Sequence, residues 1–177
     1  MSHDSPGSGA AITVRPAVAA DVPLLKSLID RMAAFERLPV TVTREALLAD
    51  GFGPTPLFRA LIAQAGGATA GYALYHSCYS SFSGKAIFLE DLYVEPEARR
   101  KRVAQALLAR VAATAIDEGC FGLVFNTLLW NTTALAFFQH AGAQRLEDWG
   151  VLTLTGEALQ AASVEGWTAP GRPESTI

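Results

Sequence analysis

One stretch in the middle of the 177-residue chain decides its fold: residues 88–108, which read FLEDLYVEPEARRKRVAQALL. The apolar and aromatic run at its start, interrupted by two acids, predicts a buried strand over 86–94. Four cations follow at 99–102. The spacing of Val103, Leu107 and Val111 then predicts an amphipathic helix over 100–118. A strand that leads through a short loop into a helix is a building unit of α/β folds.

The rest of the chain supplies the elements around this unit. Upstream, the patterns predict strands over 11–15, 58–64 and 68–76, with Gly66-Gly67 as a hairpin turn. A helix begins after Asp21, and a shorter one begins at a Thr43 cap and is closed by Gly51. Downstream we expect a buried strand over 121–127, a helix over 132–140 and a final strand over 144–154. This order predicts an α/β fold with a mixed sheet and helices on both faces.

Composition limits the kind of protein. Half the residues are hydrophobic and 18% are charged, which is typical of a globular chain. The ends are rich in Gly, Ser and Pro, so we expect one domain over 11–167 between flexible tails at 1–10 and 168–177. The formal net charge of -3 argues against nucleic acid as a partner.

The sequence has few features that indicate targeting to a membrane or redox chemistry. No apolar run reaches the roughly 18 residues that span a bilayer, and the first nine residues lack the features of a signal peptide. We therefore expect a cytoplasmic protein without a membrane partner. Cys78 and Cys120 have no ligand-like spacing, so we expect no metal site and two reduced thiols, although one disulfide stays open.

The basic loop is a candidate anion site. A strand that feeds a helix leaves free backbone N–H groups at the helix N-terminus, where the helix dipole also favours an anion. Arg99, Arg100, Lys101 and Arg102 gather four of the 14 Lys and Arg residues there. A solvated basic turn is the alternative, but cations at this end of a helix oppose the dipole.

Glu90 and Asp91 form a second candidate site. Adjacent residues of a strand point to opposite faces, so at least one of these carboxylates faces a covered surface or a cleft. Burial would raise its pKa toward the range that suits a general base at neutral pH. An edge position or an arginine partner is the alternative interpretation.

Taken together, these pieces resemble the GNAT superfamily of N-acetyltransferases, and within it the diamine (spermidine/spermine) branch. The matching motifs are Leu89–Arg99, Trp130-Asn131, Phe137-Phe138, Gly142-Ala143, Arg15-Pro16-Ala17, Ala34-Phe35-Glu36, Asp50–Gly53 and Gly84-Lys85. The resemblance implies a mostly antiparallel central sheet with a splayed parallel pair. It also implies acetyl-CoA as co-substrate, a small-molecule amine as acceptor, and a homodimer.

The resemblance also implies roles for individual residues. Glu90 matches the general base. Cofactor contacts fall on Leu92, Tyr93, Val94, Arg99, Arg100, Lys101, Arg102, Val103, Ala104, Gln105, Asn131 and Phe138. Substrate contacts fall on Phe35, Glu36, Phe82, Asp91, Glu147 and Asp148. For Phe35 and Phe82, simple core packing is the alternative.

Two positions depart from the family pattern. Arg102 replaces a glycine of the phosphate loop; if the loop keeps a helical turn, we expect Arg102 to need no positive φ. Phe138 replaces the tyrosine that protonates the leaving thiolate. Tyr93 and Cys78 are conceivable substitutes, whereas His140 should face away. The alternatives to an active small-molecule enzyme are therefore a catalytically weakened CoA-binding or ligand-sensing protein, and a protein-tail acetyltransferase.

Overall fold

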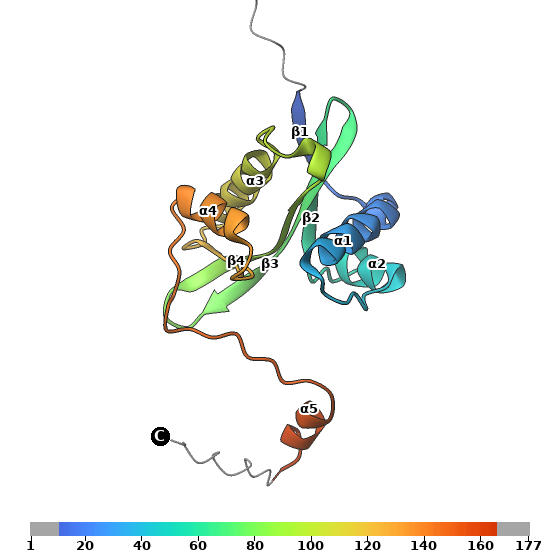
Figure 1. Ribbon diagram of the computed structural model, residues 1–177. Coiled ribbons are helices and arrows are strands. Elements are labelled where there is room, and N and C mark those ends of the chain that lie inside the picture. The colour runs from blue at the N-terminus through green and yellow to red at the C-terminus, as the bar shows by residue number, and fades with distance from the viewer. Residues whose placement is uncertain (1–10, 166–177) are drawn as a thin grey trace, which may run out of the picture. The chain divides into compact units, whose positions relative to one another are not determined.

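The computed structural model describes residues 11–165, which form two compact units that divide after Leu128. The first unit holds one five-stranded sheet whose spatial order follows the chain (Figure 1). Its strands are β1 (Ile12–Pro16), β2 (Arg59–Ala65), β3 (Ala68–Ser80), β4 (Gly84–Val94) and β5 (Leu123–Val124). The first four pair antiparallel and β4 pairs parallel with β5, so the predicted mixed sheet is confirmed.

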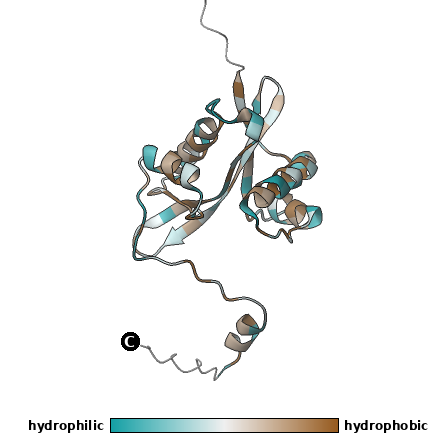
Figure 2. Ribbon diagram, in the orientation of Figure 1, coloured by the Kyte–Doolittle hydropathy of each residue, from teal (hydrophilic) through white to brown (hydrophobic). Residues whose placement is uncertain are grey.

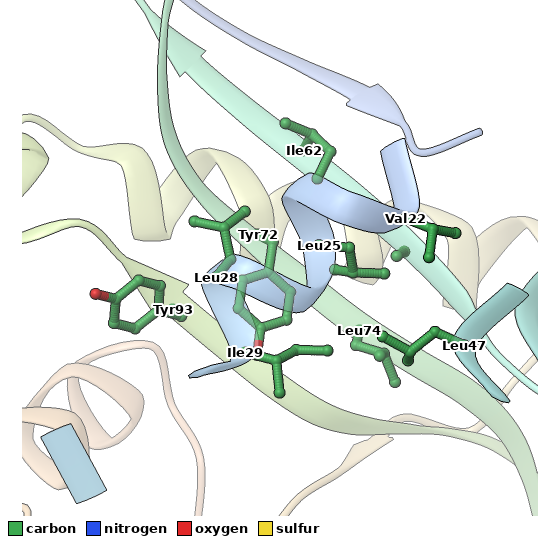
Figure 3. Packing of buried hydrophobic residues seen from close by; sticks show 10 residues of the cluster. Val22, Leu25, Leu28, Ile29, Leu47, Ile62, Tyr72, Leu74 and Tyr93 are labelled. Carbon is green, nitrogen blue, oxygen red and sulfur yellow. The ribbon is translucent and has the colours of Figure 1, made fainter. Parts of the chain in front are cut away.

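Helices cover both faces of this sheet, as predicted (Figure 1). α1 (Val22–Glu36) and α2 (Arg44–Phe52) lie on one face, and α3 (Val103–Asp117) lies on the other. Figure 3 shows Leu25, Leu28 and Ile29 of α1 packed against side chains of the sheet. Because side chains alternate along a strand, Tyr72 and Leu74 of β3 join this cluster while Ala73 points to the α3 side.

The β2–β3 hairpin follows directly from its two glycines. Gly66 and Gly67 both have positive φ, 59° and 83°, and they are the two residues between the strands. Two consecutive left-handed residues give the tight turn whose twist matches the flanking strands, and glycine adopts that conformation without steric cost.

The middle of β4 contains a β-bulge. Leu74 of β3 pairs with Asp91 and the next residue, Tyr75, pairs with Leu89, so Glu90 has no partner on β3. An extra residue in one strand bends that strand and re-aims its side chains. The bulge therefore separates the two acids: Asp91 stays in the regular alternation and Glu90 does not.

The parallel pairing of β4 with β5 is short. Ile87 pairs with Leu123 and Phe88 with Val124, and β4 continues for six residues after Phe88 without further pairing to β5. The C-terminal half of β4 therefore pairs with β3 along one edge and diverges from β5 along the other. This is the splayed parallel pair that the resemblance implied.

Several predicted boundaries are wrong. Only two residues of 121–127 form a strand, and Phe121 and Val124 are exposed rather than buried. α3 begins at Val103 instead of Arg100. Gly51 does not close α2, which ends at Phe52. Gly51 is instead needed for packing, since a Cβ there would lie 2.3 Å from the ring of Phe58.

The second unit contains α4 (Thr132–His140), as predicted, and α5 (Gly156–Ala162), which was not. The predicted strand over 144–154 is wrong: this segment has no regular structure, and its apolar side chains are exposed, Leu152 to 94%. A strand needs a neighbouring strand for its backbone hydrogen bonds, and the segment pairs with none of the described strands.

The predicted tails at 1–10 and 168–177 lie outside the described residues. Within residues 11–165, none of the helices combines the length and apolar character required to cross a membrane. The same part of the chain contains no cluster of three or more His, Cys, Asp or Glu side chains arranged to hold a metal ion. Both cysteines are free thiols.

Candidate active site

The splayed half of β4 exposes a strand edge. Leu92, Tyr93 and Val94 pair with β3 through Ala73, Tyr72 and Gly71, and β5 does not reach the opposite edge. Strand edges carry backbone N–H and C=O groups that bind extended ligands by adding hydrogen bonds like those of a further strand. The structure thus offers backbone donors and acceptors where the resemblance implied the arm of a cofactor.

The loop after β4 has an unusual backbone. Arg100 and Arg102 have φ of 61° and 65°, in the left-handed region. The expectation that Arg102 needs no positive φ is therefore wrong. A residue with a Cβ adopts this conformation at a cost of roughly 1–2 kcal/mol, because its Cβ approaches the carbonyl oxygen. Arg102 thus takes the backbone shape that a glycine would adopt freely.

α3 starts immediately after this strained residue. Arg102 is its N-cap residue and makes no side-chain capping bond, while its carbonyl accepts from the N–H of Ala106. The first-turn N–H groups of Val103, Ala104 and Gln105 precede the helical hydrogen-bond ladder and point out of the helix end. The basic loop beside them is hydrophilic, in contrast to the apolar helix that follows (Figure 2). Free donors, the helix dipole and nearby cations all favour an anion.

Side chains of α1 secure the loop. The Arg99 guanidinium lies 5.0 Å from the ring centroid of Phe35, and its Nε donates to the Val94 carbonyl at 3.3 Å. Arg31 forms an ion pair with Glu95 at 2.7 Å. A residue predicted to bind cofactor and one predicted to bind substrate, Arg99 and Phe35, are therefore neighbours.

A cleft of about 710 Å³ lies between α1, the β2–β3 hairpin and the loop after β4. Four of the predicted site residues line it: Phe35, Tyr93, Arg99 and Lys101. The remaining walls include small side chains of the hairpin, such as Ala68 and Ala70, which occupy little of the cleft.

The two acids of β4 have different surroundings. Glu90 is exposed at the bulge, whereas Asp91 is half-buried and accepts a hydrogen bond from the Tyr72 hydroxyl at 2.8 Å. Burial raises the pKa of Asp91 to about 6; the negative charges of Glu90 and Glu36 also raise it, and the Tyr72 bond opposes the rise. Burial likewise raises the pKa of Glu36. The structure therefore brings Glu36 and Asp91 to one face of the sheet.

Tyr72 is a site residue that sequence reasoning missed. It is fully buried in the apolar cluster beneath α1 (Figure 3), and its hydroxyl reaches Asp91 diagonally across β3 and β4. The available signal was a polar ring at an inward position of an otherwise apolar strand. The partner could not be predicted, because it depends on the register set by the bulge.

Comparison with known proteins decides the family. The acetyltransferase (GNAT) family model matches residues 25–143. A thialysine N-epsilon-acetyltransferase from Bos taurus is 36% identical over 162 residues, which cover 84% of this chain and 95% of the relative. This chain belongs to the GNAT acetyltransferase family.

Further relatives agree with this GNAT assignment. The human spermidine/spermine N(1)-acetyltransferase-like protein 1 is 33% identical over 82% of this chain, although the match covers 23% of that longer protein. Among solved structures, an aminoglycoside N-acetyltransferase in complex with CoA has a TM-score of 0.67 at 23% identity, covering 84% of this chain and 98% of its own. That structural likeness shows the shared GNAT fold.

Other predicted GNAT site residues lie in the second unit. Asn131 is the N-cap of α4, where its side-chain oxygen accepts from the N–H of Ala134 at 3.2 Å. Phe138 is half-buried, and its ring packs edge-on against Phe137 at 5.2 Å. Glu147, which pairs with Arg145 at 3.3 Å, and Asp148 are both exposed. Their proximity to β4 stays a prediction.

Three further residues with predicted roles, Phe82, Tyr93 and Cys78, lie in the first unit. Phe82, at the β3–β4 turn, is 92% exposed, so core packing does not explain it. The Tyr93 hydroxyl donates to Glu95 at 3.1 Å, and burial, followed by the Glu95 charge, raises its pKa. Cys78 pairs with Ala86, six residues along β4 from Leu92, which is roughly 20 Å. A role for Tyr93 or Cys78 in place of the tyrosine that the family pattern has at position 138 stays a prediction.

Proposed function

We propose that this protein transfers an acetyl group from acetyl-CoA to a primary amine of a small molecule. The observation that carries the proposal is the splayed half of β4, which ends beside the N–H groups that open α3. An acyl-CoA contains an extended, amide-containing arm followed by a pyrophosphate. The strand edge suits the arm, and the N–H groups of α3 suit the pyrophosphate. The GNAT membership of the chain and its amine-acetylating relatives support the same reaction.

The cofactor would lie along this edge. The backbone of Leu92, Tyr93 and Val94 would bond the pantetheine amides. The first-turn N–H groups of α3, from Val103 to Gln105, would receive the pyrophosphate, with the cations at 99–102 adding charge. For Asn131 and Phe138, which lie in the second unit, contact with the cofactor stays a prediction.

The acids would handle the acceptor amine. Glu90, exposed at the bulge, would take a proton from the substrate ammonium so that the nitrogen lone pair is free. The nitrogen then attacks the thioester carbonyl, and the carbon–sulfur bond breaks. Coenzyme A leaves as its thiolate, and the second proton that the nitrogen loses as the amide forms is the one that protonates it. Asp91 and Glu36 would hold the cationic amine, and Phe35, Phe82, Glu147 and Asp148 stay predicted substrate contacts.

The size of the acidic cluster favours a compact acceptor. Two carboxylates, Glu36 of α1 and Asp91 of β4, lie close enough for the charge of Glu36 to raise the pKa of Asp91. A long polyamine presents several cations, each of which needs a counter-charge on the protein. We therefore expect an amino-acid-like amine such as thialysine to react better than spermidine.

A thiol-release assay tests the reaction. The protein, acetyl-CoA and a panel of thialysine, ornithine and spermidine should release free CoA only when an amine is present. Glu90→Gln should lower kcat/KM at neutral pH about 10²-fold, because the general base is lost. Glu45→Gln, an identical change on α2, should leave the rate unchanged. Near-wild-type rates in Glu90→Gln would remove Glu90 as the base.

The second candidate function is a CoA-binding or ligand-sensing protein with weak catalysis. It is favoured by the strained Arg102 backbone and by Phe138, which has no proton to donate. Both candidates predict that acetyl-CoA raises the melting temperature, since a ligand that binds only the native state stabilises it. A thermal shift without thiol release from any amine would favour the sensor.

We propose that the protein is a homodimer. Supporting this, segment 144–154 carries five exposed apolar side chains: Leu146, Trp149, Val151, Leu152 and Leu154. Clustered exposed apolar residues mark interaction surfaces. We further propose a cytoplasmic location, which two free thiols support.

A further inference from the structure

The hydroxyl of Tyr72 needs an explanation. The side chain is fully buried, and its ring packs among Leu25, Leu28 and Ile29 and lies 6.1 Å from the ring of Tyr93 (Figure 3). A phenylalanine would fill this space with no polar atom to satisfy. Burying a hydroxyl costs free energy unless it forms a hydrogen bond, so the role of Tyr72 must lie in that bond.

The Tyr72 hydroxyl donates its hydrogen to Asp91. Two acceptors are within reach: Oδ2 of Asp91 at 2.8 Å and Sδ of Met32 at 3.5 Å. A hydroxyl has one hydrogen, and a carboxylate oxygen is a far stronger acceptor than a thioether sulfur. This hydrogen bond from Tyr72, on β3, holds Oδ2 of Asp91 in place. Among the hydrogen bonds of the described residues, none goes to the other oxygen, Oδ1.

Among the residues that the structure describes, Asp91 has no positively charged partner. The charged groups that act on it are the carboxylates of Glu36, from α1, and Glu90, from β4 itself; Tyr72 is its contact on β3. Two acids and burial all disfavour the ionised form, and the Tyr72 bond alone favours it. The missing element is a cation, and a substrate ammonium would provide one.

We propose that Tyr72 is a positioning residue, which holds the Asp91 carboxylate in the orientation that receives the substrate ammonium beside Glu36. This inference rests on the proposed function, because it requires a cationic amine as the acceptor. Tyr72 does not touch substrate: it acts through Asp91 by removing rotational freedom and by favouring the charged form.

The pH dependence of turnover tests this role. In Tyr72→Phe the ionised form of Asp91 loses its hydrogen bond, so the acidic limb of kcat/KM against pH should move to higher pH. With thialysine as acceptor, kcat/KM at neutral pH should fall about tenfold while the KM for acetyl-CoA stays constant. Met32→Leu removes the sulfur at nearly constant volume and should leave the limb in place.

A second readout does not depend on activity. Aspartate carboxyl carbons are titrated by NMR, and the Asp91 signal is the one lost in Asp91→Asn. Its midpoint should lie near 6 in the wild type and higher in Tyr72→Phe. An unchanged midpoint would overturn the inference even if the wild type turns over amines. No turnover with any amine would overturn the proposed function, and the role in substrate binding with it.

Discussion

At the scale of single residues, the side chain and the backbone of Arg102 have opposite effects. The loop requires a left-handed conformation at the start of α3, and the chain places an arginine there. The added cation favours phosphate binding, whereas the strained backbone lowers stability. The balance between these two effects can be measured.

Arg102→Gly should raise the free energy of unfolding by about 1 kcal/mol, because glycine adopts positive φ without a Cβ clash. Urea denaturation measures this change. Lys101→Gly is the matched control: it removes a cation from the same loop at a residue without positive φ, so it should lower stability. If both variants lose stability equally, the strain at Arg102 is absent.

Phe138 gives a second residue-scale prediction. Phe138→Tyr adds a hydroxyl that can protonate the leaving thiolate, so kcat should rise by tenfold or more; general acid catalysis is typically worth about 10²–10⁴-fold. Steady-state thiol release with thialysine measures it. The same change at the adjacent ring, Phe137→Tyr, should leave kcat unchanged. A constant kcat in Phe138→Tyr would mean that another group or water already supplies the proton.

At the scale of elements, β4 organises the site. Its first half pairs on both edges, its bulge separates Glu90 from Asp91, and its second half leaves one edge for a ligand. β3 must hold that second half in place along the other edge. Gly71, opposite Val94, permits the close approach: a Cβ there would lie 2.2 Å from the Tyr93 carbonyl oxygen.

Gly71→Ala should therefore separate β3 from the end of β4. We expect unfolding free energy to fall by about 1–3 kcal/mol, the usual cost of overpacking, and acetyl-CoA affinity to fall with it. Calorimetry and urea denaturation measure the two effects. Gly122→Ala, beside β5, meets no atom within 4 Å and should be close to neutral. Equal stabilities for both variants would show that β3 tolerates the displacement.

The elements also show what the sequence could and could not predict. The helical stripe of α3, the Gly66-Gly67 turn and the strands from β2 to β4 were predictable because local pattern and burial agree there. The segments 121–127 and 144–154 are apolar enough for strands, yet a strand forms only where a partner edge is available. Composition does not provide that information.

The candidate site was likewise predictable from the sequence only in part. Glu90 and Asp91 were identifiable, since acids in an apolar run are unusual. Their separation by the bulge and the bond from Tyr72 depend on register between β3 and β4, which local sequence leaves open. The φ of Arg102 was predicted wrongly because a non-glycine residue normally avoids that region, and here the surrounding fold overrides the preference.

At the scale of the whole molecule, segment 144–154 is the proposed dimer interface, because its apolar side chains are exposed. If a second copy covers it, Leu152→Asp should shift the mass measured by light scattering from dimer to monomer, because a charge would be buried at the interface. Ile116→Asp, an exposed apolar residue of α3, is the control and should remain dimeric. A monomeric wild type would contradict the proposed homodimer.

The proposed function depends on acyl-CoA binding along the splayed half of β4 and against the first turn of α3. Hydrogen exchange with and without acetyl-CoA tests it most directly, because bound backbone amides exchange more slowly. We predict slower exchange over 92–94 and 103–105, with little change in α2 on the opposite face of the sheet. Unchanged exchange in both segments at saturating acetyl-CoA would show that acyl-CoA does not bind there.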